Sequence, residues 1–364
     1  MRPPFRADHV GSLLRPTFLK EARARDTPPA ELRVLEDEAI RQVIAKQAQT
    51  GLESATDGEF RRAMWHFDFL EHLDGVESFH SDHGIAFRGG IETQKKGLRV
   101  TGRIGFSGHP MLDHFRFLHD NATAAIPKMT IPSPSVLHFR GGRKAIDPAI
   151  YPDMDEFYRD LALAYRDAVN AFAEAGCRYL QLDEVNLAYL CDTEQRQMLR
   201  DRGDDPDRLP GTYADMINTA ISSRPADMTI TMHLCRGNFR SSWIASGGYE
   251  PVAEMLFQNI GVDGYFMEFD TERAGGFEPL RFVPPGDKRV VLGLVTSKSG
   301  ALESADELQR RIHDAAKHVD LSQLCLSPQC GFASTEEGNL LTEDEQWAKL
   351  RRIVEVARTV WGTS

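Results

Sequence analysis

The chain has 364 residues, 41% of them hydrophobic and 27% charged, and its 54 acidic against 43 basic side chains give a formal net charge of −11. This acidic balance argues against a nucleic-acid partner, because phosphate contacts need a basic face. No apolar run approaches the ~18 residues of a membrane span, and the N-terminus lacks the apolar core of a signal peptide.

Short apolar, strand-like runs alternate with longer amphipathic stretches along the whole chain. The predicted strands are residues 5–10, 53–57, 127–131, 178–183, 228–234, 263–268, 289–295 and 323–327. The predicted helices are residues 30–50, 60–73, 110–120, 155–176, 211–223, 250–259, 303–318 and 342–360. Regular alternation predicts a parallel sheet in an α/β fold, and eight units predict one catalytic domain over 1–364, a single (β/α)8 TIM-type barrel.

One segment interrupts this alternation after the second unit. Residues 74–106 are rich in Gly and His and contain β-like patches such as Gly97-Leu98-Arg99-Val100. We interpret the segment as a β-hairpin-like insertion that lies over the mouth of the barrel.

Polar side chains stand where the predicted strands end. In a barrel, functional residues come from the carboxyl ends of the strands, which all open on one face. In chain order these residues are His9, Gly11 and Ser12, then Asp57 and Glu59, Ser133 and Ser135, Asp183 and Glu184, His233 and Cys235, Glu268, Thr296 and Lys298, and Cys330.

The ends of the fifth, sixth and eighth strands offer a set of metal ligands. His233, Cys235, Glu268 and Cys330 supply nitrogen, sulfur and oxygen donors, and zinc is the usual ion for Cys/His ligation. Five cysteines, an odd number in a chain this long, fit metal-binding thiols in a reducing cytoplasm better than a disulfide framework. The alternatives are that these residues fall at strand ends by chance, and that Glu268 is the partner in a buried salt bridge.

In combination these motifs resemble a known family. Residues 232–238 and 327–332, with Leu182-Asp183-Glu184 and Asp57-Gly58-Glu59, are similar to the catalytic barrel of cobalamin-independent methionine synthase. They are more similar still to its single-barrel relatives, and the resemblance covers nearly the whole chain.

The resemblance implies a function and a set of site residues. It implies a zinc-dependent methyltransferase for homocysteine, like 5-methyltetrahydropteroyltriglutamate–homocysteine methyltransferase, with Zn2+ held by His233, Cys235, Glu268 and Cys330. It implies that His9, Gly11 and Ser12 lie beside the amino-acid substrate and that Glu59 and Asp183 lie near its ammonium group. Zinc would keep the substrate thiol deprotonated and nucleophilic.

Two departures from the family leave the methyl donor open. Full-length members carry a second, N-terminal barrel that helps to bind the folate tail, and this chain lacks it. They also have a histidine, thought to act as an acid, where this chain has Lys298. Lys298 is therefore a candidate catalytic acid or anion anchor, and the donor is a methyltetrahydrofolate or another methyl carrier.

Several alternatives remain at this point. Asp183 and Glu184 could cap a helix, Glu59 could belong to a turn, and His9 could be a structural histidine. The chain could instead use another substrate pair, such as an epoxide and coenzyme M, or be a metal-free, decarboxylase-like barrel. Small molecules are the expected partners, and a homodimer is left open.

Overall fold

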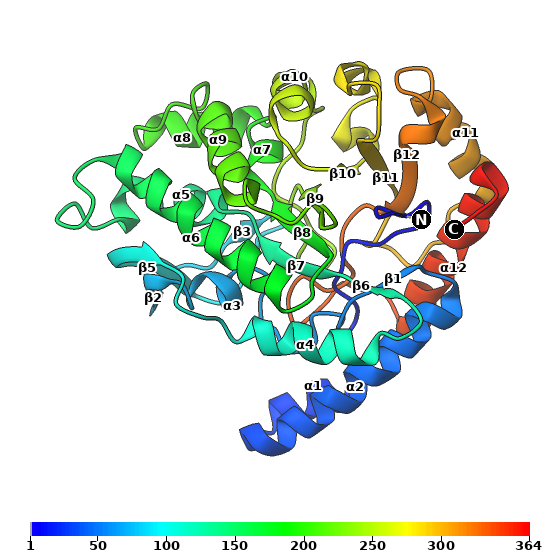
Figure 1. The fold of residues 1–364 in the computed structure, drawn as a ribbon, viewed down its shortest axis with the longest axis horizontal. Helices are drawn as coiled ribbons and strands as arrows, with labels where there is room; N and C mark the ends of the chain where they lie inside the picture. The colour runs from blue at the N-terminus through cyan, green and yellow to red at the C-terminus, as the bar shows by residue number, and fades with distance from the viewer. Residues whose placement is uncertain (1) are drawn as a thin grey trace.

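The computed structural model describes residues 2–364 and has an α/β fold built on a parallel sheet (Figure 1). Six strands form its continuous part, in the order β12-β11-β10-β9-β8-β7, and each neighbouring pair is parallel. These strands are β7 Met129–Pro132, β8 Tyr179–Glu184, β9 Thr229–Leu234, β10 Gly264–Glu268, β11 Arg289–Val295 and β12 Leu324–Pro328.

Further parallel pairs extend this sheet at both edges. Strand β6 (Ile126–Pro127) leads directly into β7 and pairs with β1 (Ser54–Ala55), while Ala7 bridges to Leu326 at the other edge. The two edges then meet, since Ser54 Oγ donates to Asp8 Oδ1 at 2.9 Å. The sheet is thus curled in the manner of a TIM-type barrel, and the predicted α/β class and parallel sheet are confirmed.

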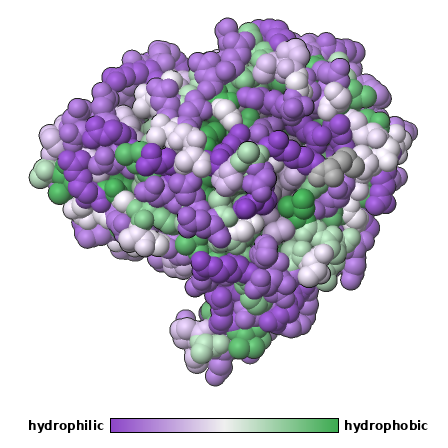
Figure 2. Space-filling model, in the orientation of Figure 1, coloured by the Kyte–Doolittle hydropathy of each residue, from purple (hydrophilic) through white to green (hydrophobic). Residues whose placement is uncertain are grey.

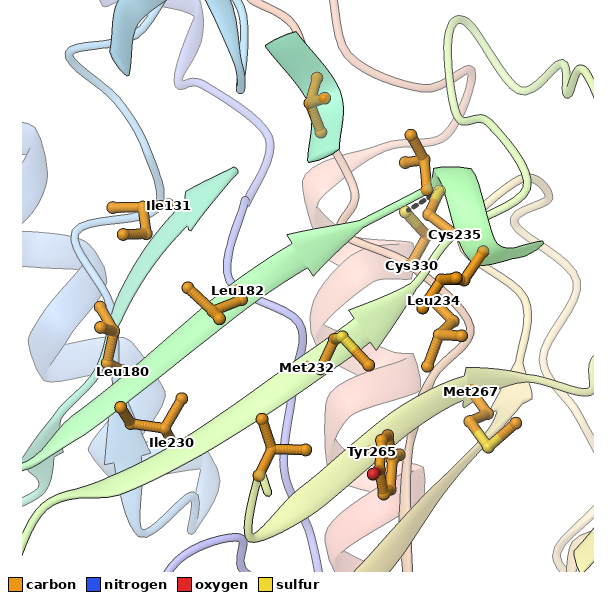
Figure 3. Packing of buried hydrophobic residues seen from close by; sticks show 14 of the residues in the cluster. Ile131, Leu180, Leu182, Ile230, Met232, Leu234, Cys235, Tyr265, Met267 and Cys330 are labelled. Carbon is orange, nitrogen blue, oxygen red and sulfur yellow. Dashed lines mark hydrogen bonds between the residues drawn. The ribbon is translucent and has the colours of Figure 1, made fainter. Parts of the chain in front are cut away.

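Alternation along the strands separates two apolar regions. Successive side chains of a strand point to opposite faces. In Figure 3, Leu180 and Leu182 of β8 and Ile230 and Met232 of β9 lie on one face, where they join the large core under the helices. A small separate cluster of Val10, Phe266, Val291 and Cys325 fills the inside of the curled sheet.

Long helices cover the outer face of the sheet (Figure 1). Two of them begin with a side-chain cap: Asp153 accepts a hydrogen bond at the start of α6, and Thr342 with Glu345 forms a capping box at α12. They lie close to the predicted ranges: α2 Pro29–Thr50, α4 Met111–Asn121, α6 Met154–Glu174, α9 Leu209–Ile221, α10 Glu250–Asn259, α11 Ala305–Ala315 and α12 Glu343–Trp361.

The helix predicted over 60–73 is wrong, since only α3 (Phe67–Leu70) forms there. The chain before it enters left-handed backbone at Gly58 and Glu59, with φ of 67° and 61°. The carboxylate of Asp68 then accepts from the amides of Ala63 and Met64 at 3.0 and 2.9 Å, which stabilises a turn instead of a helix.

Short helices add detail that the periodicity did not predict. The α-helices are α1 Thr17–Ala24, α5 Ser135–Gly141, α7 Asn186–Tyr189 and α8 Thr193–Asp201. The 3-10 helices are η1 Gly142–Ala145, η2 Glu272–Ala274, η3 Glu278–Phe282 and η4 Leu321–Gln323. Helices α1 and α2 project from the body of the molecule at the bottom of Figure 1.

Residues 74–106 form antiparallel pairs between β1 and β6. Strand β2 (Asp74–His80) pairs with β5 (Lys96–Gly105), and β3 (Ala86–Phe87) pairs with β4 (Ile91–Glu92). The tip contacts the loop after β9, because Arg88 N donates to Trp243 O at 2.8 Å and Ser242 Oγ donates to Arg88 O at 2.6 Å. The segment therefore reaches the loop that carries Cys235.

One face of the molecule is mainly polar. Figure 2 shows one face that is mostly hydrophilic, with small, separate apolar areas. Within residues 2–364, no helix combines the length and apolar character needed to cross a bilayer.

Candidate metal centre

His233, Cys235 and Cys330 meet at the carboxyl end of the sheet. One donor atom from each lies within 4.8 Å of the others, and the two Sγ atoms are 3.5 Å apart. Figure 3 shows the two cysteine side chains pointing toward each other from the ends of β9 and β12. Since β10 and β11 separate these strands in the sheet, its curl is what brings the residues together.

The chemistry of this group fits a soft divalent cation. Two sulfurs on one tetrahedral zinc, each at about 2.3 Å, would lie about 3.8 Å apart, close to the observed separation. Both ring nitrogens of His233 are buried and find no hydrogen-bond partner among the described residues. The neighbouring Cys330 thiol, and then burial, raise the pKa of Cys235 well above that of a free thiol, so two thiolates here need a compensating cation.

The two cysteine loops are held to each other and to the barrel. Asn238 Nδ2 donates to Gly331 O at 2.7 Å, and Arg236 donates to Gly247 O and to Tyr249 Oη, both at 2.7 Å. Gly237 has a φ of 97°, and a Cβ there would lie 2.8 Å from the backbone nitrogen of Ile244. The loop conformation that presents Cys235 therefore depends on glycine at this position.

Glu268, the fourth predicted ligand, lies outside this group of donor atoms. One oxygen accepts from Arg236 N at 2.7 Å, and the other pairs with Arg273 at 3.0 Å. Burial alone would raise the pKa of Glu268, but the charges of Lys298, Arg273 and Arg236 bring it down to about 2. The carboxylate is thus ionised beside the cluster and engaged by protein cations.

A pocket adjoins the cluster and contains three of the predicted substrate residues. It has a volume of about 40 Å³, and Ser12, Glu59 and Asp183 line it together with the three metal-ligand candidates. Glu59 Oε1 accepts from Thr130 Oγ1 at 2.8 Å, whereas its buried Oε2 has no partner within residues 2–364. The free oxygen could accept a hydrogen bond from a ligand.

The adjacent acids Asp183 and Glu184 have different roles. Glu184 accepts from the backbone amides of Asn186 and Leu187 at 2.7 and 3.1 Å, so it caps α7. Asp183 lines the pocket, and its Oδ1 accepts from Gln181 Nε2 at 2.7 Å. Burial raises the pKa of Asp183 to about 7, with His233 lowering it and Glu59 raising it further. A cationic ligand would relieve this cost.

Three other predicted residues lie outside the pocket lining. His9 is buried, and burial with the charge of Lys128 lowers its pKa to about 4. Gly11 has a φ of 144°, and a Cβ on it would lie 2.7 Å from Thr130 Cγ2 and 3.3 Å from Glu59 Oε1, so glycine allows Glu59 its close approach. Lys298 Nζ is buried beside Glu268 and Asp270 and has no hydrogen-bond partner in the described chain.

Sequence reasoning did not assign two residues that line the pocket. Arg140 lies in the last turn of the unpredicted helix α5, and Tyr189 is the last residue of α7. His66 also lines the pocket, and both of its ring nitrogens lack partners among residues 2–364. Only the tertiary fold brings these side chains to the site.

Comparison with known proteins agrees with this geometry. Residues 134–359 match the family model described as the catalytic domain of cobalamin-independent synthase. The chain is 52% identical to the uncharacterized protein YxjH of Bacillus subtilis, over 99% of this chain and 96% of that protein. It is 22% identical to methionine synthase of Pyrococcus abyssi, over 96% and 91% of the two chains.

A solved structure extends the comparison to three dimensions. The putative vitamin-B12 independent methionine synthase from Listeria monocytogenes is 44% identical and superimposes with a TM-score of 0.80, covering 100% of this chain and 99% of that one. The resemblance found in the motifs is therefore confirmed, and the chain belongs to the family of the cobalamin-independent synthase catalytic domain.

Proposed function

We propose that this chain is a zinc-dependent methyltransferase that transfers a methyl group to the thiol of homocysteine and so forms methionine, working in the cytoplasm on a complete (β/α)8 barrel. The observation that carries the proposal is the His233, Cys235 and Cys330 group beside a pocket that also contains Glu59 and Asp183. The names of the relatives from Pyrococcus and Listeria support the same reaction class.

Each side of the pocket has its own task in this proposal. Zn2+ held by His233, Cys235 and Cys330 supplies the positive charge that keeps a substrate thiol deprotonated at neutral pH. Glu59 and Asp183 bind the ammonium of the amino acid through the free Glu59 oxygen and the Asp183 carboxylate. Together they orient the thiol, and orientation supplies much of the rate enhancement in a group transfer.

The roles of Glu268 as a zinc ligand and of Lys298 as an acid or anion anchor have less direct support. Glu268 as a fourth ligand remains a prediction, and that role requires it to exchange its contacts with Arg236 and Arg273 for the metal. Lys298 as an acid for the leaving group, or as an anchor for an anion, also remains a prediction. Its buried, unpaired Nζ favours a charge role toward Glu268 and Asp270.

A second candidate uses the same metal chemistry on another thiol, such as coenzyme M. The two carboxylates in the pocket count against it, because a sulfonate would face like charge there. A metal-free, decarboxylase-like activity would leave the clustered thiols and the unpaired His233 ring without a role.

Turnover assays with zinc-loaded protein test the proposal. Homocysteine and coenzyme M are each offered with a panel of methyl donors that includes methyltetrahydrofolate and a methylated corrinoid, and the products are measured by mass spectrometry. We expect about one zinc per chain and methionine from at least one donor. Protein that binds no zinc, or that alkylates only the sulfonate thiol, would overturn the proposal.

A further inference from the structure

Strand β8 sends alternate side chains to the two faces of the curled sheet. Leu180 and Leu182 join the large core under the helices (Figure 3), so Tyr179, Gln181 and Asp183 point to the inside. Asp183 lines the pocket beside the metal-ligand candidates, and Gln181 lies one inward-facing position before it on the strand. Gln181 has no exposed surface and does not line the pocket. It is therefore a polar side chain enclosed beneath the site.

The amide group of Gln181 donates both of its hydrogens. Its Nε2 lies 2.7 Å from the carbonyl oxygen of Val10 and 2.7 Å from Asp183 Oδ1. The flipped amide would place Oε1 against the Val10 carbonyl, which accepts hydrogen bonds and cannot donate one. These two partners therefore fix the orientation of the side chain.

This orientation leaves the other end of the amide without a partner. Gln181 Oε1 is buried and makes no hydrogen bond within residues 2–364. Thr231, its register partner on β9, likewise has a buried and unpaired Oγ1. A buried polar atom without a partner destabilises a fold. Methionine has nearly the same length and would avoid this cost, so packing alone does not explain a glutamine here.

The carboxylate of Asp183 is held by Gln181. Among the described residues, the contact with Gln181 Nε2 is the hydrogen bond that this carboxylate accepts, and it leaves Oδ2 free. A neutral amide fixes one oxygen and leaves the negative charge available to a ligand. Glu268 shows the opposite arrangement, because Arg273 already pairs with its carboxylate at 3.0 Å.

The second amide hydrogen of Gln181 holds the segment that contains Val10, Gly11 and Ser12. Val10 and Ser12 line the same pocket as Asp183, and the family resemblance places Gly11 and Ser12 beside the amino-acid substrate. One side chain thus ties this segment to Asp183 through two contacts of 2.7 Å. A change at Gln181 would alter the spacing between these two parts of the pocket.

We propose that Gln181 is a positioning residue that makes this site selective for thiols that carry an ammonium group. It holds Asp183 Oδ1 and the Val10 carbonyl, so that Asp183 Oδ2 is directed to the ammonium of the substrate. Gln181 acts through these two residues and itself contacts neither the substrate nor the metal group. The inference rests on the proposed function, because homocysteine is the ligand that brings an ammonium to the pocket.

Calorimetry on the zinc-loaded protein tests this role without turnover. The two ligands are homocysteine and 4-mercaptobutanoate, which lacks the amino group. Gln181→Met keeps the length of the side chain and removes both donors. We expect homocysteine to bind the variant roughly tenfold more weakly, while the affinity for 4-mercaptobutanoate and the zinc content change less than about twofold. Unchanged homocysteine affinity, or an equal loss for both thiols, would overturn the proposal.

Two further variants guard against a general effect on folding. Gln181→Asn keeps a buried amide that is too short to reach Asp183, and it should show the same selective loss. Thr231→Val is the matched control, because Thr231 lies beside Gln181 on the next strand and makes no contact with Asp183. It should leave both thiol affinities unchanged. A loss of homocysteine affinity in Thr231→Val as large as in Gln181→Met would overturn the assignment to Gln181.

A double-mutant cycle shows whether Gln181 acts through Asp183. In the background of Asp183→Asn, the change Gln181→Met should alter homocysteine affinity less than about twofold, because the charge that Gln181 directs is already gone. A further tenfold loss in the double variant would overturn the proposed route.

The outcome is separable from that of the proposed function. A preference for the ammonium thiol that depends on Gln181, in a protein that never makes methionine, would support this role and reject the reaction. Wild-type protein that shows no preference for homocysteine over 4-mercaptobutanoate would overturn the role, whatever the reaction is.

Discussion

The pocket beside His233, Cys235 and Cys330, here called the metal pocket, shares a wall with a cavity between residues 66–99 and α5. We call this second space the basic cavity, because Lys96, Arg99, Arg140 and Lys144 line it, and the two spaces differ in charge. The pocket contains two thiols, an imidazole and the carboxylates of Glu59 and Asp183, whereas the described lining of the cavity contains four cations and no acid. A cationic amino group and an anionic substrate end would therefore be drawn to different sides of His66, Ile85 and Arg140. Within a chain whose net charge is −11, the two spaces therefore differ in the sign of the charge that lines them.

Neighbouring charges also give different pKa values to two carboxylates near the His233, Cys235 and Cys330 group. Asp183 and Glu268 are both buried, yet the pKa of Asp183 is raised to about 7 while that of Glu268 is lowered to about 2. Burial raises both values, so the neighbouring cations make the difference. Glu268 already has Lys298, Arg273 and Arg236 beside it, whereas Asp183 has room for a cation from a ligand.

The largest expected effect comes from removing a thiol from the metal pocket. Cys235→Ser and Cys330→Ser should each weaken zinc binding by more than about 100-fold and abolish methyl transfer, because each removes one of three clustered donors. Elemental analysis and competition with a chelator measure the change. Cys177→Ser is the control, since Cys177 is buried away from the pocket and donates to Tyr179 O. Full zinc retention in either test variant would remove the metal assignment.

Asp183→Asn tests the acidic side of the metal pocket. We expect homocysteine binding to weaken by roughly 1–3 kcal/mol, because the ammonium loses a charged partner. Calorimetry with 4-mercaptobutanoate, which lacks the amino group, is the matched comparison, and its affinity should change little. If both ligands lose affinity equally, Asp183 does not recognise the ammonium group.

Sequence patterns predicted the parts of this molecule that follow from local periodicity. The strand predicted at 289–295 coincides with β11, and the helix predicted at 250–259 coincides with α10. His233, Cys235 and Cys330 could be grouped because parallel strands open on one face of a barrel. Their residue types then indicated a metal.

Features that depend on tertiary contacts could not be predicted from local sequence patterns. The helix predicted at 60–73 does not form, because Glu59 adopts a left-handed backbone conformation and the Asp68 carboxylate accepts hydrogen bonds from the amides of Ala63 and Met64. Arg140 lies on a helix of seven residues, too short for a clear hydrophobic period. The ion pair between Glu268 and Arg273 joins strand β10 to the 3-10 helix η2, and no spacing rule reveals which cation such an acid will meet.

Glu268→Gln sharpens the comparison between the two carboxylates. Since Glu268 is ionised and paired with Arg273, we expect the variant to lose roughly 1–2 kcal/mol of unfolding free energy, and its zinc content reports whether the carboxylate is also the predicted fourth ligand. Denaturant unfolding and zinc analysis of the same samples measure both quantities. Loss of zinc on the scale of the cysteine variants would instead show that Glu268 is a ligand.

The smallest expected effect concerns His66, on the wall between the two spaces. Burial, and then the charges of Arg140 and Lys96 from the basic cavity, lower the pKa of His66 well below its usual value. The folded protein therefore holds this ring neutral, while the unfolded chain takes up a proton below about pH 6.5. Stability should fall as pH drops below about 6.5, because the unfolded state then binds more protons.

His66→Gln should remove this part of the acid sensitivity. The loss of unfolding free energy between pH 7 and pH 5.5 should be about 1 kcal/mol smaller in the variant than in the wild type. Chemical unfolding at both pH values measures this difference, and the exposed His80 provides the control variant His80→Gln. The remaining slope belongs to other buried histidines such as His109 and His138, whose pKa values burial lowers to about 4. Equal slopes in His66→Gln and the wild type would mean that the pKa of His66 is not lowered in the folded protein.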